Sequence, residues 1–394
     1  MAVIEMGHRI AILGGGLFDG TGADLIQDAA VIVVGDRIEA VGAAVDVGAE
    51  TADETIDLRP CTLLPGLIDA HVHLWGRSPR DRMPWATGPI EYRALRTAGE
   101  ANSLLEAGFT AVRDLGSQTS VSLKKGIDEG IVPGPRMIAA GMAVARTRGP
   151  WFAIDRSWRW VRPADGVDAC IRAVQQSLLE GSSLLKIGAS AGVDSAWGEI
   201  PTYSIDEVRA MTEVARAWGV RTAVHAMGDE AVRRSVLGGV DTVEHGYNIT
   251  PDTLNLIVER GVFLVPTLRI RHNDQSEWGK ETFKVQLESL KRAHEAGARL
   301  ALGTDSTGAE EGSVHGHGNA IEFKLMGDVM EPRDALVAGM KTAAEAMGLE
   351  DDIGTLEAGK YADVVAVRDD PLKNLEVLQH VEFVMQGGKV IKRP

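Results

Sequence analysis

The two ends of the chain share a short alternation of apolar and polar residues that differs from the middle. Residues 8–60 contain the runs HRIAILGG, DAAVIVVGDRIEAVG and TIDL, and residues 353–394 contain KYADVVAVRDD and VEFVMQGGKVIKR. These runs are separated by turn residues and carry no helical period, which is typical of strands joined by hairpins. We therefore predict one small β domain built from residues 1–60 and 353–394.

The middle of the chain, residues 61–352, carries apolar runs that alternate with segments of helical period. Helix starts are recognisable: Ser204 and Glu207 form a capping box, Thr250 precedes a proline, and Glu331 precedes another. Strands that alternate with helices form parallel βα units, and eight such units close a (β/α)₈ barrel. The predicted strands are Leu63–His73, Thr110–Leu115, Arg136–Ala140, Leu184–Ala189, Arg221–Ala226, Asp241–Gly246, Phe263–Leu268 and Leu300–Asp305. The predicted fold class is α/β, a TIM barrel with the small β domain attached.

Polar residues that can bind a metal stand at or near the carboxyl-terminal ends of five predicted strands. They are His71, His73, Lys186, His225, His245 and Asp305. In a barrel these strand ends meet at one mouth, where barrel active sites lie. The spacing of His71 and His73 puts both rings on one face of a strand, which suits a divalent cation but is also typical of a solvated pair. Four such histidines with an aspartate are hard to explain by packing.

Lys186 stands inside the apolar run SLLKIG, where desolvation of a charged amine is costly. Two structural explanations are open: a lysine that extends to the rim of the barrel, or a lysine paired with a carboxylate. The functional explanation is a lysine carboxylated by CO₂. Its anionic carbamate could bridge two metal ions, which an ammonium group cannot do.

Composition limits the partners of the protein. The chain has 394 residues and a formal net charge of −15, which disfavours binding to nucleic acid or to an anionic membrane. Cys61 and Cys170 are not spaced as a metal or redox pair, so we expect two buried free thiols. No secretory signal and no membrane-spanning run is recognisable. We expect a soluble, cytoplasmic homo-oligomer that acts on a small molecule.

A more specific likeness is carried by seven elements in order: PGLIDAHVH, LLKIG, VHA, VEHG, VPTL, LGTDS and IGTLEAGKYADVVAV. In these elements the chain resembles the amidohydrolase superfamily, and within it the imidazolonepropionase-like and metal-dependent dipeptidase (prolidase-like) amidohydrolases. The resemblance spans residues ~60 to ~367. It implies a distorted barrel with a urease-like β domain and a two-metal site bridged by carboxylated Lys186.

The chemistry of these residues agrees with that implication. One metal would be held by His71, His73 and Asp305, the other by His225 and His245, with the Lys186 carbamate between them. Zinc suits four neutral imidazoles and two carboxylate-type groups. A water that bridges two cations loses a proton easily, and the hydroxide would attack a polarised carbonyl carbon. Asp305 would take the proton and pass it to the leaving amine.

The segment RTRGPWFAIDRSWRW follows the third predicted strand and is rich in aromatic residues, which make up 5% of the chain. Loops at this position face the mouth of a barrel, so the segment is either a substrate wall or a surface loop folded on its own aromatics. Many prolidase-like relatives resemble one another in a TGGH element here, where this chain has TRGP, which puts dipeptidase activity in doubt. We expect Arg148, Trp151 and Phe152 to contact a substrate with an aromatic or bulky group.

Three other residues near these strands have less certain roles, and two of them are open to two interpretations. Tyr247 either donates to substrate or packs beside the sixth strand, and His315 either faces substrate or stands in solvent. Glu244 precedes His245 on a strand, so it should point away from the mouth, as a pairing partner in the barrel wall.

The run GGGLFDG resembles a dinucleotide loop, but strand-like sequence follows it, which argues against nucleotide binding.

These observations predict a hydrolase of an amide-like C–N bond in an N-acyl amino acid, a dipeptide-like compound or an aryl amide. A cyclic amide, lactone, carbamate or urea is the alternative, because the same site serves them all and pocket shape decides. A non-catalytic relative would lack ligands, whereas all six are present.

Overall fold

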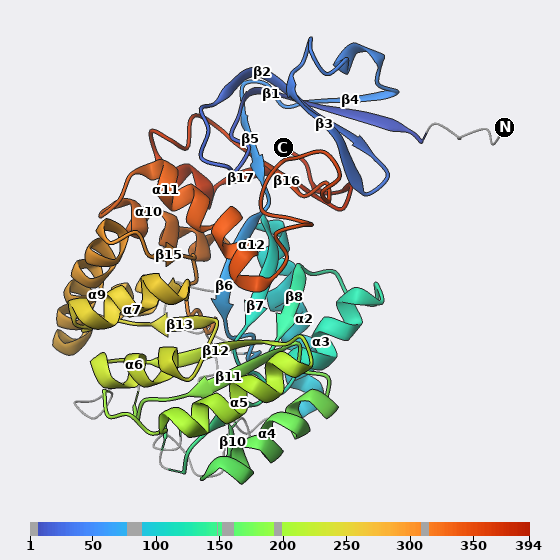
Figure 1. The fold of residues 1–394 in the computed structure, drawn as a ribbon. Coiled ribbons are helices and arrows are strands. Elements are labelled where there is room, and N and C mark those ends of the chain that lie inside the picture. The colour runs from blue at the N-terminus through green and yellow to red at the C-terminus, as the bar shows by residue number, and fades with distance from the viewer. Residues whose placement is uncertain (1–6, 77–88, 148, 152–160, 193–198, 309–314) are drawn as a thin grey trace.

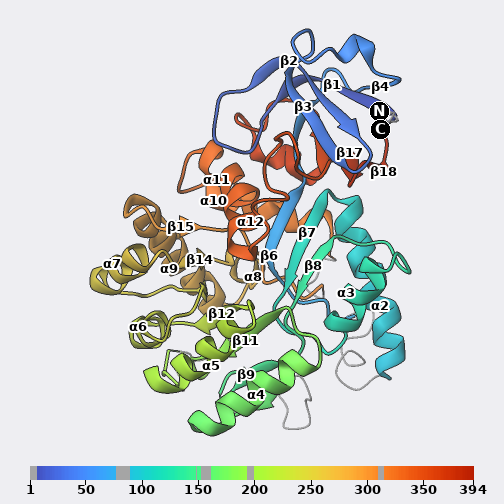
Figure 2. The same cartoon turned by 45° about the vertical axis from the view of Figure 1, so that its right-hand side comes forward.

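The computed structural model describes residues 7–76, 89–147, 149–151, 161–192, 199–308 and 315–394 (Figure 1). It is a mixed α/β fold, in which one sheet lies at one end of the molecule and the other strands lie among helices (Figures 1 and 2). The α/β class predicted from the sequence is therefore confirmed.

The sheet at the end of the molecule is built from both ends of the chain. Its order is β18-β17-β16-β5-β1-β2-β3, and β4 pairs with β1. Most of its pairs are antiparallel, but β1 runs parallel to β4 and β5. The strands are β1 (Arg9–Leu17), β2 (Ile26–Val34), β3 (Arg37–Ala43), β4 (Glu54–Asp57), β5 (Thr62–Pro65), β16 (Val364–Val367), β17 (Val381–Gln386) and β18 (Lys389–Lys392).

Two all-parallel sheets form the middle of the molecule. The first has the order β6-β7-β8 and the second β10-β9-β11-β12-β13-β14-β15. The strands are β6 (Leu67–Val72), β7 (Phe109–Asp114), β8 (Arg136–Ala139), β9 (Ala143–Ala145), β10 (Val161–Pro163), β11 (Leu184–Gly188), β12 (Arg221–Ala226), β13 (Thr242–His245), β14 (Phe263–Val265) and β15 (Arg299–Leu300).

Helices follow most of these parallel strands and lie outside them, as Figure 2 shows for α5 and α6 beside β11 and β12. The predicted capping box of Ser204 and Glu207 begins α5, and Thr250 caps α7. The helices are α2 (Ile90–Glu106), α3 (Ser120–Asp128), α4 (Val167–Leu179), α5 (Ile205–Ala217), α6 (Asp229–Leu237), α7 (Pro251–Arg260), α8 (Leu268–His272), α9 (Glu277–Glu295), α10 (Ile321–Gly327), α11 (Pro332–Ala338), α12 (Lys341–Met347), and the 3₁₀ turns η1 (Ala49–Thr51), η2 (His317–Ala320) and η3 (Leu375–Gln379).

Backbone hydrogen bonds join the two parallel sheets at two places. The amide of Asp305, after β15, donates to the carbonyl of His71 in β6 over 2.8 Å, and the amide of His73 donates to Ser306 over 2.9 Å. On the other side of the three-stranded sheet, the amide of Ser183 before β11 donates to Ala139 at the end of β8 over 2.9 Å. The two bonds of β6 bring the first parallel strand next to the segment that follows the last one, where the predicted site lies.

The first and last predicted barrel strands differ from the observed ones. The run predicted as one strand over Leu63–His73 is two strands, because β5 pairs with β1 and β16 whereas β6 pairs with β7. The chain changes sheet at Gly66, where any Cβ atom would collide with Thr110 of β7. Strand β15 is shorter than predicted, and Asp305 beyond it has the left-handed φ of 54°.

Two other expectations from the sequence concern cysteines and membranes. Cys61 and Cys170 are both buried and free, as predicted. Across the described ranges, no helix combines the length and apolar character that crossing a membrane requires.

Candidate metal centre

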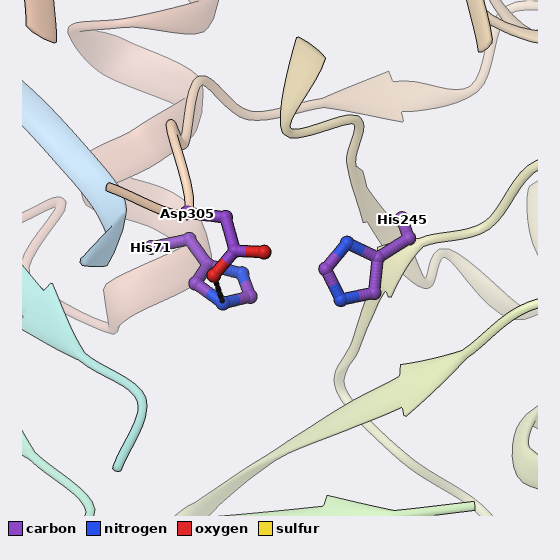
Figure 3. Close-up of side chains that lie close together, drawn as sticks. All are labelled: His71, His245 and Asp305. Atoms are coloured by element: carbon purple, nitrogen blue, oxygen red, sulfur yellow. Dashed lines mark ion pairs between the residues drawn. The ribbon is translucent and has the colours of Figure 1, made fainter. Parts of the chain in front are cut away.

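Three of the predicted ligands lie together at the strand ends. His71 belongs to β6, His245 ends β13, and Asp305 follows β15. One potential ligand atom from each lies within 4.8 Å of the others, and the His245 ring faces the Asp305 carboxylate and the His71 ring (Figure 3). Segments that are far apart in sequence therefore converge on a volume that one cation could occupy.

The other two histidines extend this group into a row of rings. Ring centroids lie 5.4 Å apart for His73 and His71, 5.4 Å for His71 and His245, and 4.6 Å for His245 and His225. Oδ1 of Asp305 lies 3.3 Å from Nε2 of His71 and 3.2 Å from Nε2 of His73. The structure thus brings five of the six predicted ligands into one continuous cluster.

Lys186, the sixth, lies in the middle of β11 and is 1% exposed. Its register partner in β12 is Ala223, two residues before His225. Within the described part of the chain its Nζ atom has no hydrogen-bond partner. Burial lowers the pKa of Lys186 to about 8, although the charges of Glu244 and Asp305 oppose that shift. Neither structural explanation considered from the sequence, a rim position or a direct carboxylate partner, fits this setting.

The protonation states of the cluster suit a cation. Burial lowers the pKa of His225 to about 3, and Lys186 adds to that effect. Burial and His225 likewise hold the pKa of His245 well below its usual value. Burial would raise the pKa of Asp305, but His71 and His73 outweigh it and hold that pKa well below the usual range. Neutral imidazoles beside an ionised carboxylate are the forms that ligate a divalent metal.

The backbone is strained at three positions of the centre. His245, Asp305 and Thr267 have φ values of 72°, 54° and 52°, in the left-handed region that non-glycine residues rarely adopt. Such a conformation costs about 1–3 kcal/mol per residue and persists where the surroundings enforce it, often at functional sites. This strain aims the side chains of His245 and Asp305 away from the regular strand direction.

Each of three histidine rings has an acceptor at Nδ1 that leaves Nε2 available. Nδ1 of His71 lies 2.7 Å from Oε2 of Glu244, Nδ1 of His73 lies 3.1 Å from the carbonyl of Gly116, and Nδ1 of His245 lies 2.7 Å from Oγ1 of Thr267. His225 differs, because its Nε2 lies 3.4 Å from the carbonyl of Gly192. Contacts of this kind select the tautomer of a ligand histidine.

Glu244 and Arg113 form a buried ion pair behind the cluster, so Glu244 is a pairing partner as expected, but the sequence reasoning missed both Arg113 and the contact of Glu244 with a candidate ligand. Glu244 was expected to point away from the mouth, whereas its fully buried carboxylate contacts His71 and accepts from Nη2 of Arg113 over 2.9 Å. Burial opposes ionisation, but the charge of Arg113 and the contact with His71 lower the pKa of Glu244 to about 2. A charged residue within each of two apolar strands, TAVRD and TVEH, was the available signal.

The predicted substrate contacts are placed unequally. Trp151 lies beside the site, with its ring centroid 5.3 Å from that of His225. Tyr247 is buried, and its hydroxyl contacts Sδ of Met227 at 2.9 Å. His315 is 3% exposed and its Nε2 lies 3.1 Å from the carbonyl of His73, so it supports the backbone of a candidate ligand instead of standing in solvent. Arg148 and Phe152 lie outside the described residues.

Trp75 is an aromatic neighbour of the site that the sequence reasoning did not single out. Its ring centroid lies 4.8 Å from that of His73, and its indole N–H donates to the carbonyl of Gly116 over 2.7 Å. The row of four histidines therefore ends in a tryptophan on each side, Trp75 beyond His73 and Trp151 beyond His225.

Comparisons with known proteins agree with this geometry. A model described as the amidohydrolase family matches residues 62–392. The chain belongs to the amidohydrolase family. Among similar proteins, the ochratoxinase of Aspergillus niger is 25% identical over 426 residues, which cover 98% of this chain and 87% of that protein. The imidazolonepropionase of Symbiobacterium thermophilum is 27% identical, with 100% of this chain and 96% of that protein covered.

Solved structures extend the likeness to three dimensions. A crystal structure of a Xaa-Pro dipeptidase with methionine bound in its active site matches this amidohydrolase with a TM-score of 0.87 at 27% identity, covering 97% of this chain and 99% of that one. The family and these relatives confirm the prediction of an enzyme that hydrolyses carbon–nitrogen bonds.

Proposed function

We propose that this amidohydrolase uses two divalent cations, with zinc as the best match, to hydrolyse an amide-like C–N bond in a compound with an aromatic or bulky group. The observation that carries the proposal is that four histidines and Asp305 converge at the ends of the parallel strands beside the Lys186 amine, which has no hydrogen-bond partner among the described residues. The substrate classes that fit are N-acyl amino acids, dipeptide-like compounds and aryl amides.

Lys186 provides the test of whether the residues fit such cations. A buried amine with no hydrogen-bond partner among the described residues is unfavourable, because burial removes its hydration without compensation. Carboxylation by CO₂ forms an N–C bond, releases a proton from the amine and leaves an anionic carbamate. That anion supplies the oxygen ligands that the histidine-rich side of the centre lacks, so the donor set fits two cations.

Each residue then has a distinct role in the proposed centre. His71, His73 and Asp305 would hold one cation, His225 and His245 the other, and carboxylated Lys186 would contact both. Such cations, when bound, polarise a carbonyl group and lower the pKa of water. Asp305 would accept a proton from the attacking water and return it to the leaving nitrogen. Its contacts with His71 and His73 both use Oδ1, which leaves Oδ2 for the proton.

We also propose the architecture that positions this centre. Residues 61–352 would form a distorted (β/α)₈ barrel, and residues 1–60 and 353–394 a urease-like β domain. Strand β5 is the exception, because it falls within the first range but pairs with β1 and β16 of the β domain. The backbone bonds that link β6 to residues 302–306 and β8 to Ser183 support a closed barrel. The proposed ligands then lie at the carboxyl-terminal mouth, where barrel enzymes have their active sites.

The aromatic rings at the two ends of the histidine row support the choice of substrate. Trp75 and Trp151 are both partly exposed, so an apolar group on either side of the reacting bond could contact an indole. Relatives named as an ochratoxinase and as a Xaa-Pro dipeptidase support an amide bond. The relative named imidazolonepropionase supports the second candidate, a cyclic amide, lactone, carbamate or urea.

The test is a hydrolysis screen of purified protein, stripped with a chelator and reloaded with zinc. The panel contains N-acyl amino acids, dipeptides, aryl carbamates and lactones, each with an aromatic and a small member. We expect two zinc ions per chain by elemental analysis, activity only after reloading, and a preference for the aromatic amide members. Activity that survives in metal-free protein would overturn the proposal, and turnover of lactones or carbamates alone would select the second candidate.

A further inference from the structure

Arg113 and Glu244 form a charged pair inside the molecule, behind the proposed ligands. Both side chains are 0% exposed, and Nη2 of Arg113 donates to Oε1 of Glu244 over 2.9 Å. Arg113 comes from β7 and Glu244 from β13, two strands that belong to different parallel sheets. The pair therefore crosses the interior rather than linking neighbouring strands.

Two further contacts of the pair lead to His71 and its neighbour Ala70. Nε of Arg113 donates over 2.6 Å to the carbonyl of Ala70, the residue before His71. Oε2 of Glu244 lies 2.7 Å from Nδ1 of His71. Thr242 links the two charges, because its hydroxyl donates to Glu244 and accepts from Nη1 of Arg113. Among the described residues, the side chain that this network contacts in the candidate centre is the ring of His71.

Stability of the core does not account for such a pair. Transferring two charges out of water costs several kcal/mol per ion, and a buried pair is often no more stabilising than apolar residues of the same volume. The neighbouring rings also lack a comparable partner: His73 contacts a carbonyl, His245 a hydroxyl and His225 a carbonyl. Among the described ligand histidines, His71 alone has a carboxylate at Nδ1.

We propose that Arg113 and Glu244 are positioning residues for the proposed metal centre. Glu244 accepts the Nδ1 proton of His71, which leaves Nε2 as the ligand atom and makes that imidazole the most electron-rich of the set. Arg113 balances the charge of Glu244, so that the carboxylate stays a strong acceptor in a dry interior. This inference rests on the proposed function, since it concerns how the first cation is held.

The test compares zinc binding with folding in a variant that removes both charges, Arg113→Met/Glu244→Gln. Neutralising the pair together leaves no unpaired charge in the core, so we expect the apo-protein to unfold within a few degrees of wild type. Zinc affinity at one of the two sites should fall about 10- to 100-fold in chelator competition, the range found when outer partners of ligand histidines are removed. The absorption bands of the Co²⁺-substituted protein should shift. The fold decrease in kcat should be larger than any fold change in KM.

A matched control removes a partly buried ion pair that has no contact with the proposed ligands among the described interactions. Arg136 donates to Asp363 over 3.1 Å beside the terminal sheet, and Asp363 is 4% exposed. The variant Arg136→Met/Asp363→Asn should change stability and leave zinc affinity and the Co²⁺ spectrum as in wild type. If the Arg113/Glu244 double variant does not fold, Thr242→Val weakens the same network with both charges kept, and should lower zinc affinity a few-fold.

The outcomes separate this inference from the proposed function. Wild-type zinc affinity retained in the folded double variant, or in Thr242→Val when the double variant does not fold, would make the pair purely structural and overturn the inference. Wild-type protein that binds no zinc would overturn the proposed function itself. Loss of zinc affinity in the Arg136/Asp363 control to the same degree would also overturn the inference, because removing an ion pair remote from the ligands would then have the same effect.

Discussion

The two halves of the centre are built in different ways. On one side, His71 and His73 both contact the Asp305 carboxylate, and His71 is connected to the buried charges of Glu244 and Arg113. On the other side, His245 contacts a threonine hydroxyl, His225 contacts a carbonyl, and the Lys186 amine has no hydrogen-bond partner in the described structure. The first half contains the carboxylates of Asp305 and Glu244, whereas the described residues assigned to the second half include none of their own, and His245 instead lies within 4.8 Å of the Asp305 carboxylate.

This difference shows what the second half still requires. A cation held by two neutral imidazoles in a low-dielectric interior needs a nearby negative charge, because neither ring offsets its charge. Lys186 is the described residue of this half that can acquire one, by carboxylation. The first half can be organised before any cation binds, whereas the second would be completed together with its cation.

The largest effect is expected from Lys186→Ala, which removes the one source of charge in the second half. The variant should keep the first cation, lose the second and lose nearly all activity, measured as zinc per chain and kcat/KM. Reconstitution of wild-type apo-protein should be faster with bicarbonate, and the variant should show no such effect. Lys124→Ala, at a partly exposed lysine paired with Asp128, is the control and should behave as wild type. Full activity of Lys186→Ala would refute the carbamate.

Asp305→Asn tests the half with the preformed anion, and we place its effect next. The amide keeps the shape of the side chain but cannot accept the proton, so kcat should fall about 100- to 10,000-fold, the usual contribution of a general acid–base group. Thermal unfolding should change little, because residue 305 keeps its backbone bond to His71. Zinc content must be measured alongside, since Asp305 is also a proposed ligand. A change confined to KM would assign Asp305 to substrate binding.

Residues set by local pattern were predictable from the sequence. His71 and His73 are two positions apart in one apolar run, and His225, His245 and Asp305 end three others, so parallel βα units bring them to one end without further information. The helix starts at Ser204 and Thr250 also depend on neighbours three residues away. The α/β class and the cluster of candidate ligands follow from such short-range rules.

Features set by long-range contacts were not predictable. The break at Gly66 depends on Thr110, and the direction of Glu244 depends on Arg113, which is 131 positions away. Alternation along an ideal strand sends Glu244 away from the mouth, whereas the left-handed backbone of His245 ends that alternation. Trp75 carries no signal in the sequence beyond its type, and only the fold places it against His73.

Truncating the two tryptophans would show which half faces the apolar part of the substrate. Trp75→Ala removes the ring beside His73, and Trp151→Ala removes the ring beside His225. The variant on the correct side should lose about 10-fold or more in kcat/KM for the aromatic member of a substrate pair and little for the small member, because apolar pockets discriminate by amounts of this size. Trp218→Ala, at an exposed tryptophan, is the control. Turnover of both members unchanged from wild type in both variants would end the inference of an aromatic substrate.

The smallest effect concerns the support of the second half, through Glu322 of α10. Its buried carboxylate accepts from the amides of Leu268 and Arg269 over 2.8 Å each, and so holds the start of α8 directly after Thr267, the partner of His245. Burial raises the pKa of Glu322 from 4.5 to about 8, with Asp69 adding to the rise and the amides and Arg269 opposing it. Between these two values the folded protein keeps a proton that the unfolded chain has lost.

Stability from this group is therefore complete below the unfolded pKa of 4.5 and is lost as pH rises through about 8. Glu322→Gln removes the titration, so the difference in Tm between variant and wild type should move in favour of the variant by a few degrees between about pH 6 and about pH 9. Apo-protein is used, so that metal binding does not contribute. Glu207→Gln is the control, because the pKa of Glu207 is lowered and that residue is ionised at both pH values. A constant difference for Glu322→Gln would mean that Glu322 is ionised in the folded protein, and that the start of α8 is held by a buried negative charge.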